Sequence, residues 1–127
     1  MYRETTDGIL VEVNPTYMKE HSDPTQRLFV FSYEVTISNE SRKPARLVSR
    51  HWVIRDGDGT EREVEGDGVV GEQPNLPPGG SFTYSSYCPL STPTGSMRGT
   101  YRMAREDGTT FDAKIPLFFL RDLAQYN

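Results

Sequence analysis

Three glycines near the middle of the chain have the spacing of a phosphate-binding loop. They are Gly66, Gly68 and Gly71, which form G-x-G-x-x-G within the stretch GDGVVGEQPNLPPGG. In a dinucleotide-binding fold this pattern ends a strand and opens a helix, and the first amides of that helix hold the pyrophosphate. Prolines follow at positions 74, 77 and 78, and proline removes amide donors and blocks a helix. The sequence therefore predicts a long ordered loop, not a dinucleotide-binding helix.

The same glycines are candidates for a simpler anion site. Successive backbone amides in a glycine-rich turn can form a nest that binds a phosphate without a helix. Asp67 and Glu72 flank the turn with negative charge, which repels such a ligand. Two interpretations follow: Gly66, Gly68 and Gly71 bind an anion, or they only supply the positive φ angles that a crossing loop needs.

Carboxylates crowd the segment DGDGTEREVEGD, residues 56–67, and hard divalent cations prefer such oxygen ligands. Asp56 and Asp58 begin like a calcium loop, but Glu61 stands where that loop needs a glycine. Glutamates at the alternate positions 61, 63 and 65 would spread over about 13 Å along a strand, so they do not converge on one ion. The sequence therefore favours a charged edge strand, with no metal site and no cofactor. Direct binding of a magnesium or cobalt ion by the hairpin from Asp56 to Asp67 is the alternative.

The residue types of nucleophilic catalysis are present but are not arranged for it. Serines in SFTYSSYC lie outside any G-x-S-x-G turn, and His51 has no carboxylate assigned to orient it. Cys88 alternates with Phe82 and Tyr84, which predicts that it faces the core as a small buried side chain. We therefore expect no enzymatic activity. The lone cysteine excludes an intrachain disulfide and fits a reducing compartment.

Basic side chains are predicted to face outward on two strands. Arg98 and Arg102 lie on either side of an inward-facing Tyr101. Further basic residues lead into or along an earlier strand: Arg42, Lys43, Arg46 and Arg50. If the two strands share a sheet, these charges form one patch for an acidic partner or a phosphate; otherwise carboxylates such as Asp112 balance them.

Apolar side chains alternate with polar ones in most of the chain, which is the period of a β-strand. The segments with this pattern are 8–18, 28–39, 45–55, 60–66, 81–88, 95–106 and 109–120. Asp-Gly pairs at 56–59 and at 107–108 predict hairpin turns. In the last hairpin we expect Phe111, Ile115 and Leu117 to face inward together. No stretch has the capped, helical spacing of apolar residues.

Composition and strand spacing together predict one all-β domain over residues 1–127. The chain is 35% hydrophobic and 11% aromatic, enough for a single core. About seven short antiparallel strands with one tryptophan favour an immunoglobulin-like, fibronectin type III-like β-sandwich, with a closed barrel as the alternative. The net charge of -4 argues against broad attraction to nucleic acid or anionic lipid. Without a leader or a membrane-spanning run, we expect a cytoplasmic protein.

Several long motifs resemble those of ApaG proteins. They are VNPTY, FSYEVTISN, LVSRHWVI, FDAKIP and the run GDGVVGEQPNLPPGGSFTYSSYCPLSTPTGSMRGTY, so that the resemblance covers residues 9–122. It implies a fibronectin type III-like sandwich and a link by name to cobalt and magnesium efflux or resistance. It also implies reuse as an appended module in eukaryotic F-box adaptors and in a polymerase-delta-interacting protein. No agreed catalytic activity accompanies the family, so the resemblance points to protein–protein interaction.

We therefore expect a non-enzymatic ApaG-type module that binds a protein partner. The long loop and the 91–95 connection would present the contact surface, because functional residues tend to lie on loops held by a rigid scaffold. The candidate contact residues are Gln73, Leu76, Arg98 and Arg102. Pyrophosphate or nucleotide-type binding at the glycine loop is the alternative. An unpaired edge strand is compatible with a monomer and with a dimer.

Overall fold

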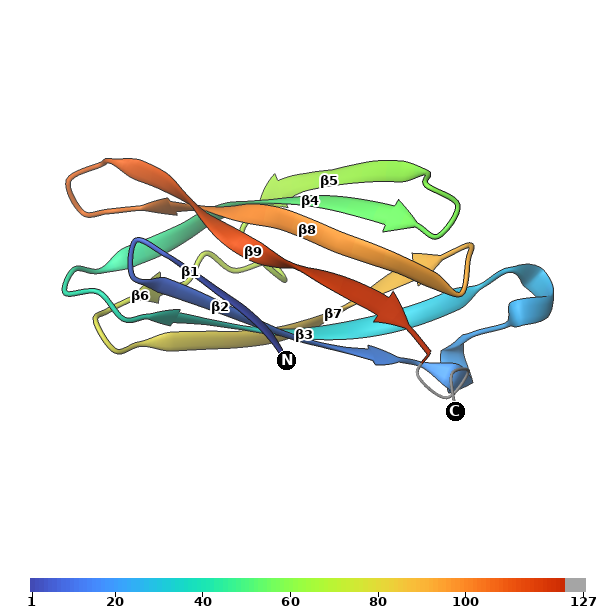
Figure 1. Ribbon diagram of the computed structural model, residues 1–127. Helices are drawn as coiled ribbons and strands as arrows, with labels where there is room; N and C mark the ends of the chain where they lie inside the picture. Colours follow the sequence, from blue (N-terminus) through green and yellow to red (C-terminus); the bar gives the residue numbers. More distant parts are fainter. Residues whose placement is uncertain (123–127) are drawn as a thin grey trace.

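Two antiparallel sheets face each other in the computed structural model, which describes residues 1–122 (Figure 1). The first sheet has the order β1 (Tyr2–Thr6), β2 (Ile9–Tyr17), β3 (Phe29–Asn39) and β7 (Ser81–Leu90). The second has the order β5 (Glu61–Asp67), β4 (Ala45–Asp56), β8 (Thr94–Ala104) and β9 (Thr110–Arg121), and the short β6 (Asn75–Leu76) pairs with the start of β4. Two single 3-10 turns, η1 (Lys19–His21) and η2 (Pro24–Gln26), lie between β2 and β3.

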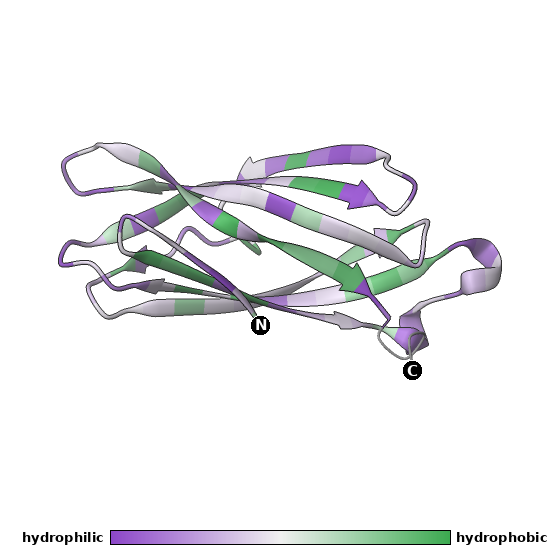
Figure 2. Ribbon diagram, in the orientation of Figure 1, coloured by the Kyte–Doolittle hydropathy of each residue, from purple (hydrophilic) through white to green (hydrophobic). Residues whose placement is uncertain are grey.

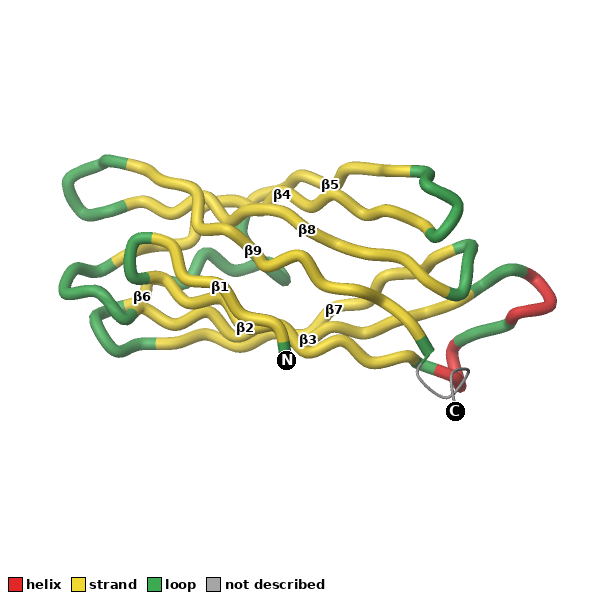
Figure 3. The backbone as a smooth tube through the Cα atoms, in the orientation of Figure 1, coloured by secondary structure: helices red, strands yellow, loops and turns green. Residues whose placement is uncertain are grey.

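This architecture confirms the predicted all-β, fibronectin type III-like sandwich, and the sheets do not close into a barrel. Most connections gather at the two ends of the sandwich, whereas the connection from β5 to β6 lies between those ends (Figure 3). Strand β1 was not predicted. It pairs with β2 through the two-residue turn Asp7-Gly8, where both φ angles are positive, 48° and 81°, as a type I′ hairpin requires.

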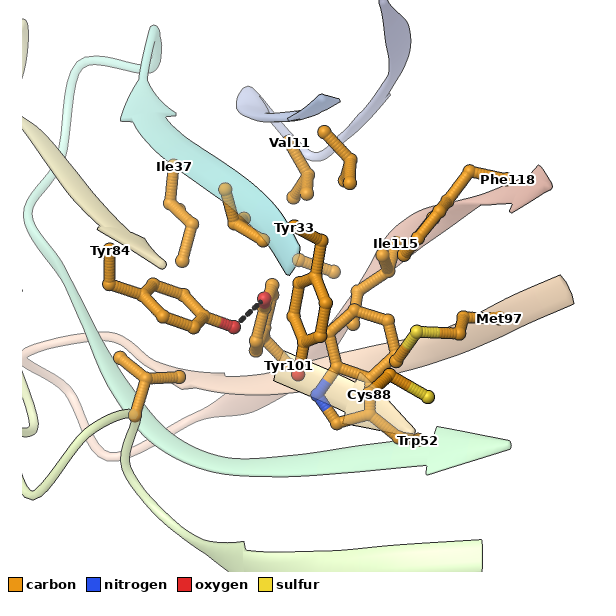
Figure 4. Packing of buried hydrophobic residues seen from close by; sticks show 14 of the residues in the cluster. Val11, Tyr33, Ile37, Trp52, Tyr84, Cys88, Met97, Tyr101, Ile115 and Phe118 are labelled. Atoms are coloured by element: carbon orange, nitrogen blue, oxygen red, sulfur yellow. Dashed lines mark hydrogen bonds between the residues drawn. The ribbon is translucent and has the colours of Figure 1, made fainter. Parts of the chain in front are cut away.

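The core lies between the sheets because nearly every second residue of the long strands points inward. Hydropathy follows the same division, with polar residues concentrated in the turns and in β5 (Figure 2). Trp52 packs edge-on against rings from both sheets, with centroids 5.3 Å from Tyr33, 6.2 Å from Tyr101 and 5.9 Å from Phe118 (Figure 4). The hydroxyls of Tyr84 and Tyr101 are hydrogen-bonded to each other across the interior (Figure 4). The aromatic cluster thus joins the two layers.

The buried side chain of Asn39 links the β3–β4 connection to β6 by hydrogen bonds at one end of the sandwich. Its side chain is 1% exposed, and its amide donates to the carbonyls of Lys43 at 2.8 Å and Leu76 at 2.9 Å. Its side-chain oxygen accepts from the backbone N–H and the hydroxyl of Ser41. Every polar group of the side chain is therefore used, which holds the β3–β4 connection and β6 in place.

The Arg105 side chain links three connections at the same end of the sandwich, on its outer surface. Its guanidinium donates to the carbonyls of Asp7 and Lys43, each at 3.0 Å, and lies 4.8 Å from the ring centroid of Phe111. These contacts join the β1–β2, β3–β4 and β8–β9 connections. No helix among the described residues is long and apolar enough to cross a membrane.

Candidate interaction surface

The glycine-rich segment is ordered and hydrogen-bonded to β4, and no helix follows it within residues 68–80. The loop is shorter than predicted, because Gly66 still belongs to β5 and Asn75–Leu76 form β6. The Gly68 N–H donates to the carbonyl of Val48 at 2.8 Å. Val69 and Glu72 exchange two backbone hydrogen bonds, of 2.8 and 2.9 Å, around a tight turn. The amides that an anion nest at this turn would need are therefore largely committed to the protein itself, which weakens the case for a pyrophosphate there.

Two of the three glycines have close neighbours, and at Gly68 the neighbour is backbone, which cannot move aside as a side chain can. A Cβ on Gly68 would lie 2.2 Å from the carbonyl oxygen of Glu72. A Cβ on Gly66 would lie 2.8 Å from the guanidinium of Arg50. Gly71 has open space around it but a φ of 80°. The G-x-G-x-x-G spacing is thus accounted for by packing and backbone conformation.

Arg50 turns inward instead of joining a basic patch. Its Nη1 donates to the carbonyls of Asp67 at 3.1 Å and Gly68 at 3.0 Å. The cause is an irregular register between Leu47 and Ser49, after which Arg50 lies opposite the buried Tyr101. Arg50 thus belongs to the support of the glycine loop, which the sequence did not indicate.

The two loop residues expected to contact a partner differ in their exposure to solvent. Gln73 is exposed, although its Nε2 donates to the carbonyl of Val48 at 2.8 Å. Leu76 is only 3% exposed, because β6 pairs with Ala45 and tucks this side chain into the core. The prediction that Leu76 contacts a partner is corrected accordingly. Val70, at the tip of the turn, is the exposed apolar residue of this loop.

The outward arginines of β8 are paired with carboxylates. Arg98 Nη1 lies 3.3 Å from Glu61 Oε2, and Arg102 Nε lies 3.3 Å from Asp112 Oδ1. Both side chains face outward, as predicted, and Asp112 balances Arg102 as the second interpretation proposed. The Arg50 guanidinium, in contrast, is bound by carbonyls of the glycine loop.

His51 does have carboxylate neighbours, which the sequence left unassigned. Its Nε2 lies 2.7 Å from Glu63 Oε1 and 3.7 Å from Glu65 Oε1, because the β4–β5 register sets these residues side by side. Glu63 and Glu65 therefore contact His51 of β4, and Glu61 pairs with Arg98 of β8. Within residues 1–122, no three His, Cys, Asp or Glu side chains gather so that they could hold a metal ion.

Cys88 faces the core, as predicted, and is 2% exposed. Burial raises the pKa of its thiol, although Arg62 Nη2 lies 3.7 Å from the sulfur and opposes this effect. The thiol is therefore protonated near neutral pH, which is the unreactive form.

The strongest exposed apolar feature lies on the outer face of the second sheet, at the end that carries the 56–60 and 91–93 turns. Leu117 and Phe119 are 49% and 48% exposed there. With three arginines they form the arginine–apolar surface, defined as Arg55, Arg98, Leu117, Phe119 and Arg121, which borders a hollow of about 500 Å³. The Arg121 guanidinium lies 5.9 Å from the Phe119 ring centroid. Among residues 1–122, Arg55 has no ion pair.

A β-bulge produces this surface and overturns one prediction. Met97 pairs with Phe118, but Gly99 pairs with Ile115, so one residue of β8 faces two of β9. Ile115 and Pro116 are both buried, and the alternation then resumes in the opposite phase. Leu117 therefore points outward instead of joining Phe111 and Ile115. The proline within the apolar run was the signal in the sequence that could have indicated the break.

The fold and this surface define a fibronectin type III-like β-sandwich domain with an exposed arginine-rich, apolar face. The chain belongs to the ApaG family, because the ApaG domain matches residues 19–105. It is 54% identical over 118 residues to Protein ApaG of Anaeromyxobacter dehalogenans, covering 93% of each chain. To Protein ApaG of Pseudomonas aeruginosa it is 51% identical over 117 residues, which are 92% of this chain and 93% of the relative.

Solved structures agree with this assignment. The crystal structure of the ApaA protein from Bordetella pertussis superposes with a TM-score of 0.86 at 48% identity, covering 94% of each chain. The C-terminal domain of wzt superposes with a TM-score of 0.55 at 12% identity, covering 94% of this chain and 76% of that one. That second likeness shows the sandwich fold alone.

Proposed function

We propose that this chain is a non-enzymatic ApaG-type binding module that engages a protein partner through the arginine–apolar surface. The observation that carries the proposal is the exposure of Leu117 and Phe119 beside three arginines. Aromatic side chains and arginine are enriched in protein interfaces and dominate their binding energy. Two half-exposed large apolar residues on one strand are also the kind of patch that a partner covers.

The chemistry of the surface defines the partner segment. Arg55 has no carboxylate within ion-pair distance in residues 1–122, and Arg98 shares only Glu61. Guanidinium groups bind carboxylates in a planar, bidentate geometry. A partner segment with Asp or Glu next to an aromatic or aliphatic side chain would fill the hollow and pair with Arg55. Arg98, a candidate from the sequence, belongs to this surface, whereas Arg102 pairs with Asp112 outside it.

The other sequence hypotheses have less support. Cys88 is buried and protonated, and His51 faces Glu63 and Glu65, which favours a non-enzymatic role. The link to cobalt and magnesium homeostasis implied by the resemblance would act through the partner, not through an ion held by these residues. We place the module in the cytoplasm because its single thiol and the sequence pattern fit a reducing compartment.

A panel of short random peptides displayed on phage tests the proposal. We expect the bound peptides to be enriched in Asp or Glu beside an aromatic or aliphatic residue. Arg55→Glu combined with Phe119→Ser should weaken their binding by at least about tenfold. The matched control is Arg46→Glu, an exposed arginine on the same strand outside the surface, which should bind normally. Peptides without acidic residues, or equal binding by the double variant, would refute the proposal.

A further inference from the structure

The two sheets have four outer edges, and β7 differs from the other three. It is the sequence SFTYSSYCPL, which contains no charged residue. Strand β5 is EREVEGD, β1 carries Arg3 and Glu4, and β9 carries Asp112, Lys114 and Arg121. Charged residues are the usual protection of an edge strand against pairing with another chain. At ten residues, β7 is a long edge without that protection.

The backbone of β7 presents unpaired groups on its outer side. The carbonyl of Gly80 accepts a hydrogen bond from the Asn39 N–H on β3. In the register of the two strands, the backbone N–H and C=O groups of the even-numbered residues of β7 therefore point toward β3. The backbone groups of the odd-numbered residues Ser81, Thr83, Ser85 and Tyr87 point away from it. The carbonyl of Pro89 confirms this direction, because it accepts from Arg62 Nη2 of β5 at 2.5 Å. In residues 1–122, the four outward positions have no backbone hydrogen-bond partner.

We propose that β7 accepts an extended segment of another protein as an added antiparallel strand. Main-chain hydrogen bonds to Thr83, Ser85 and Tyr87 would supply affinity, as in other cases of strand addition to a sheet edge. The side chains at these positions are exposed, and that of Tyr87 is 60% exposed. They suit uncharged β-branched or aromatic neighbours.

Arg62 adds a charge requirement at one end of the edge. Its guanidinium sits at the Pro89 carbonyl, and it makes no ion pair with any residue of 1–122. Pro89 lies near the C-terminal end of β7, so a segment that pairs antiparallel with β7 has its N-terminus there. A carboxylate near the N-terminus of the segment would therefore meet Arg62.

A second copy of this chain fits the edge poorly. Two β7 strands related by a two-fold axis would also bring the two β5 strands toward each other, because β5 lies on the same side of the sandwich, as the Arg62–Pro89 contact shows (Figure 1). Each β5 carries four carboxylates against one arginine, so like charges would meet. A single strand of a partner brings no such opposing layer. Strand β7 is an edge of the first sheet, whereas the arginine–apolar surface lies on the second, so partner binding at one does not depend on the other.

The test uses a synthetic peptide of alternating threonine and valine with an N-terminal aspartate. We expect it to slow hydrogen exchange at the amides of Thr83, Ser85 and Tyr87 by at least about tenfold, because these amides become hydrogen-bonded. The same peptide with N-methyl groups at alternate residues should not bind. Replacing its aspartate by lysine should weaken binding in the native chain but make little difference in Arg62→Gln.

Two variants separate docking from folding. Ser85→Lys places a charge on the edge and should abolish binding while the chain stays folded. Ser85→Pro should also fold, because its N–H points away from β3, whereas Ser86→Pro should be strongly destabilised. Binding of the N-methylated peptide, or unchanged binding by Ser85→Lys, would contradict the proposal. A different outcome would be a dimer of the native chain in which these amides already exchange slowly without peptide. If Ser85→Lys abolished that dimer, a second copy of the chain would occupy the edge instead.

Discussion

Asn39 shows how much one buried polar side chain can decide. Its side-chain amide makes four hydrogen bonds to two segments, the β3–β4 connection and β6, and no polar side-chain atom buried within residues 1–122 is left without a partner. The sequence marked Asn39 only as the end of a strand. Its role depends on β6 arriving beside it from a distant part of the chain.

Asn39→Ala should lower the free energy of unfolding by about 2–4 kcal/mol, because it strands the carbonyl of Leu76 and other buried partners without hydrogen bonds. Urea denaturation followed by circular dichroism measures the change. Asn14→Ala is the control, since Asn14 is exposed on β2 and should change stability by less than about 0.5 kcal/mol. A loss as small as that of the control would show that water replaces these bonds at little cost.

At the scale of elements, the glycine loop allows a comparison between two positive-φ glycines. Gly68 and Gly71 have φ angles of 61° and 80°. Gly71→Ala meets open space and should cost only the backbone strain, about 1–2 kcal/mol. Gly68→Ala adds a contact of 2.2 Å with a backbone oxygen and should cost clearly more. Equal losses in denaturation experiments would mean that the 68–72 turn shifts freely.

The strands themselves were largely predictable, because alternation of buried and exposed side chains is a local property of the sequence. What could not be predicted depends on pairing between strands. The phase of Leu117 is set by a bulge opposite Arg98, and the burial of Leu76 by two residues of β6 reaching β4. The candidate surface therefore emerged only with the register, although one of its members, Arg98, was identified from its outward position.

At the scale of the whole molecule, buried tyrosines make stability dependent on alkaline pH. Burial raises the pKa of three tyrosines: Tyr84, its hydrogen-bond partner Tyr101, and the nearby Tyr33. The folded state therefore holds these protons more tightly than the unfolded chain, whose tyrosines ionise near pH 10. The stability they contribute is complete below about pH 10 and is lost as pH rises toward the folded pKa values.

We expect the free energy of unfolding to fall above about pH 10 by up to about 1.4 kcal/mol per pH unit for each such tyrosine. Urea denaturation at a series of alkaline pH values measures the slope. Tyr84→Phe with Tyr101→Phe removes both hydroxyls of one hydrogen bond, so it should preserve the fold and flatten the slope. A slope unchanged in this double variant would assign the alkaline loss to other groups.

Trp52 is the only tryptophan of the chain, and it touches Tyr33 from the opposite sheet as well as Tyr101 and Phe118 from its own. Its intrinsic fluorescence therefore reports whether the two sheets remain packed together. Separation of the layers would admit water to the indole and shift its emission to longer wavelengths. Strand addition on the outer side of β7 does not separate the layers and would leave the emission near its folded wavelength.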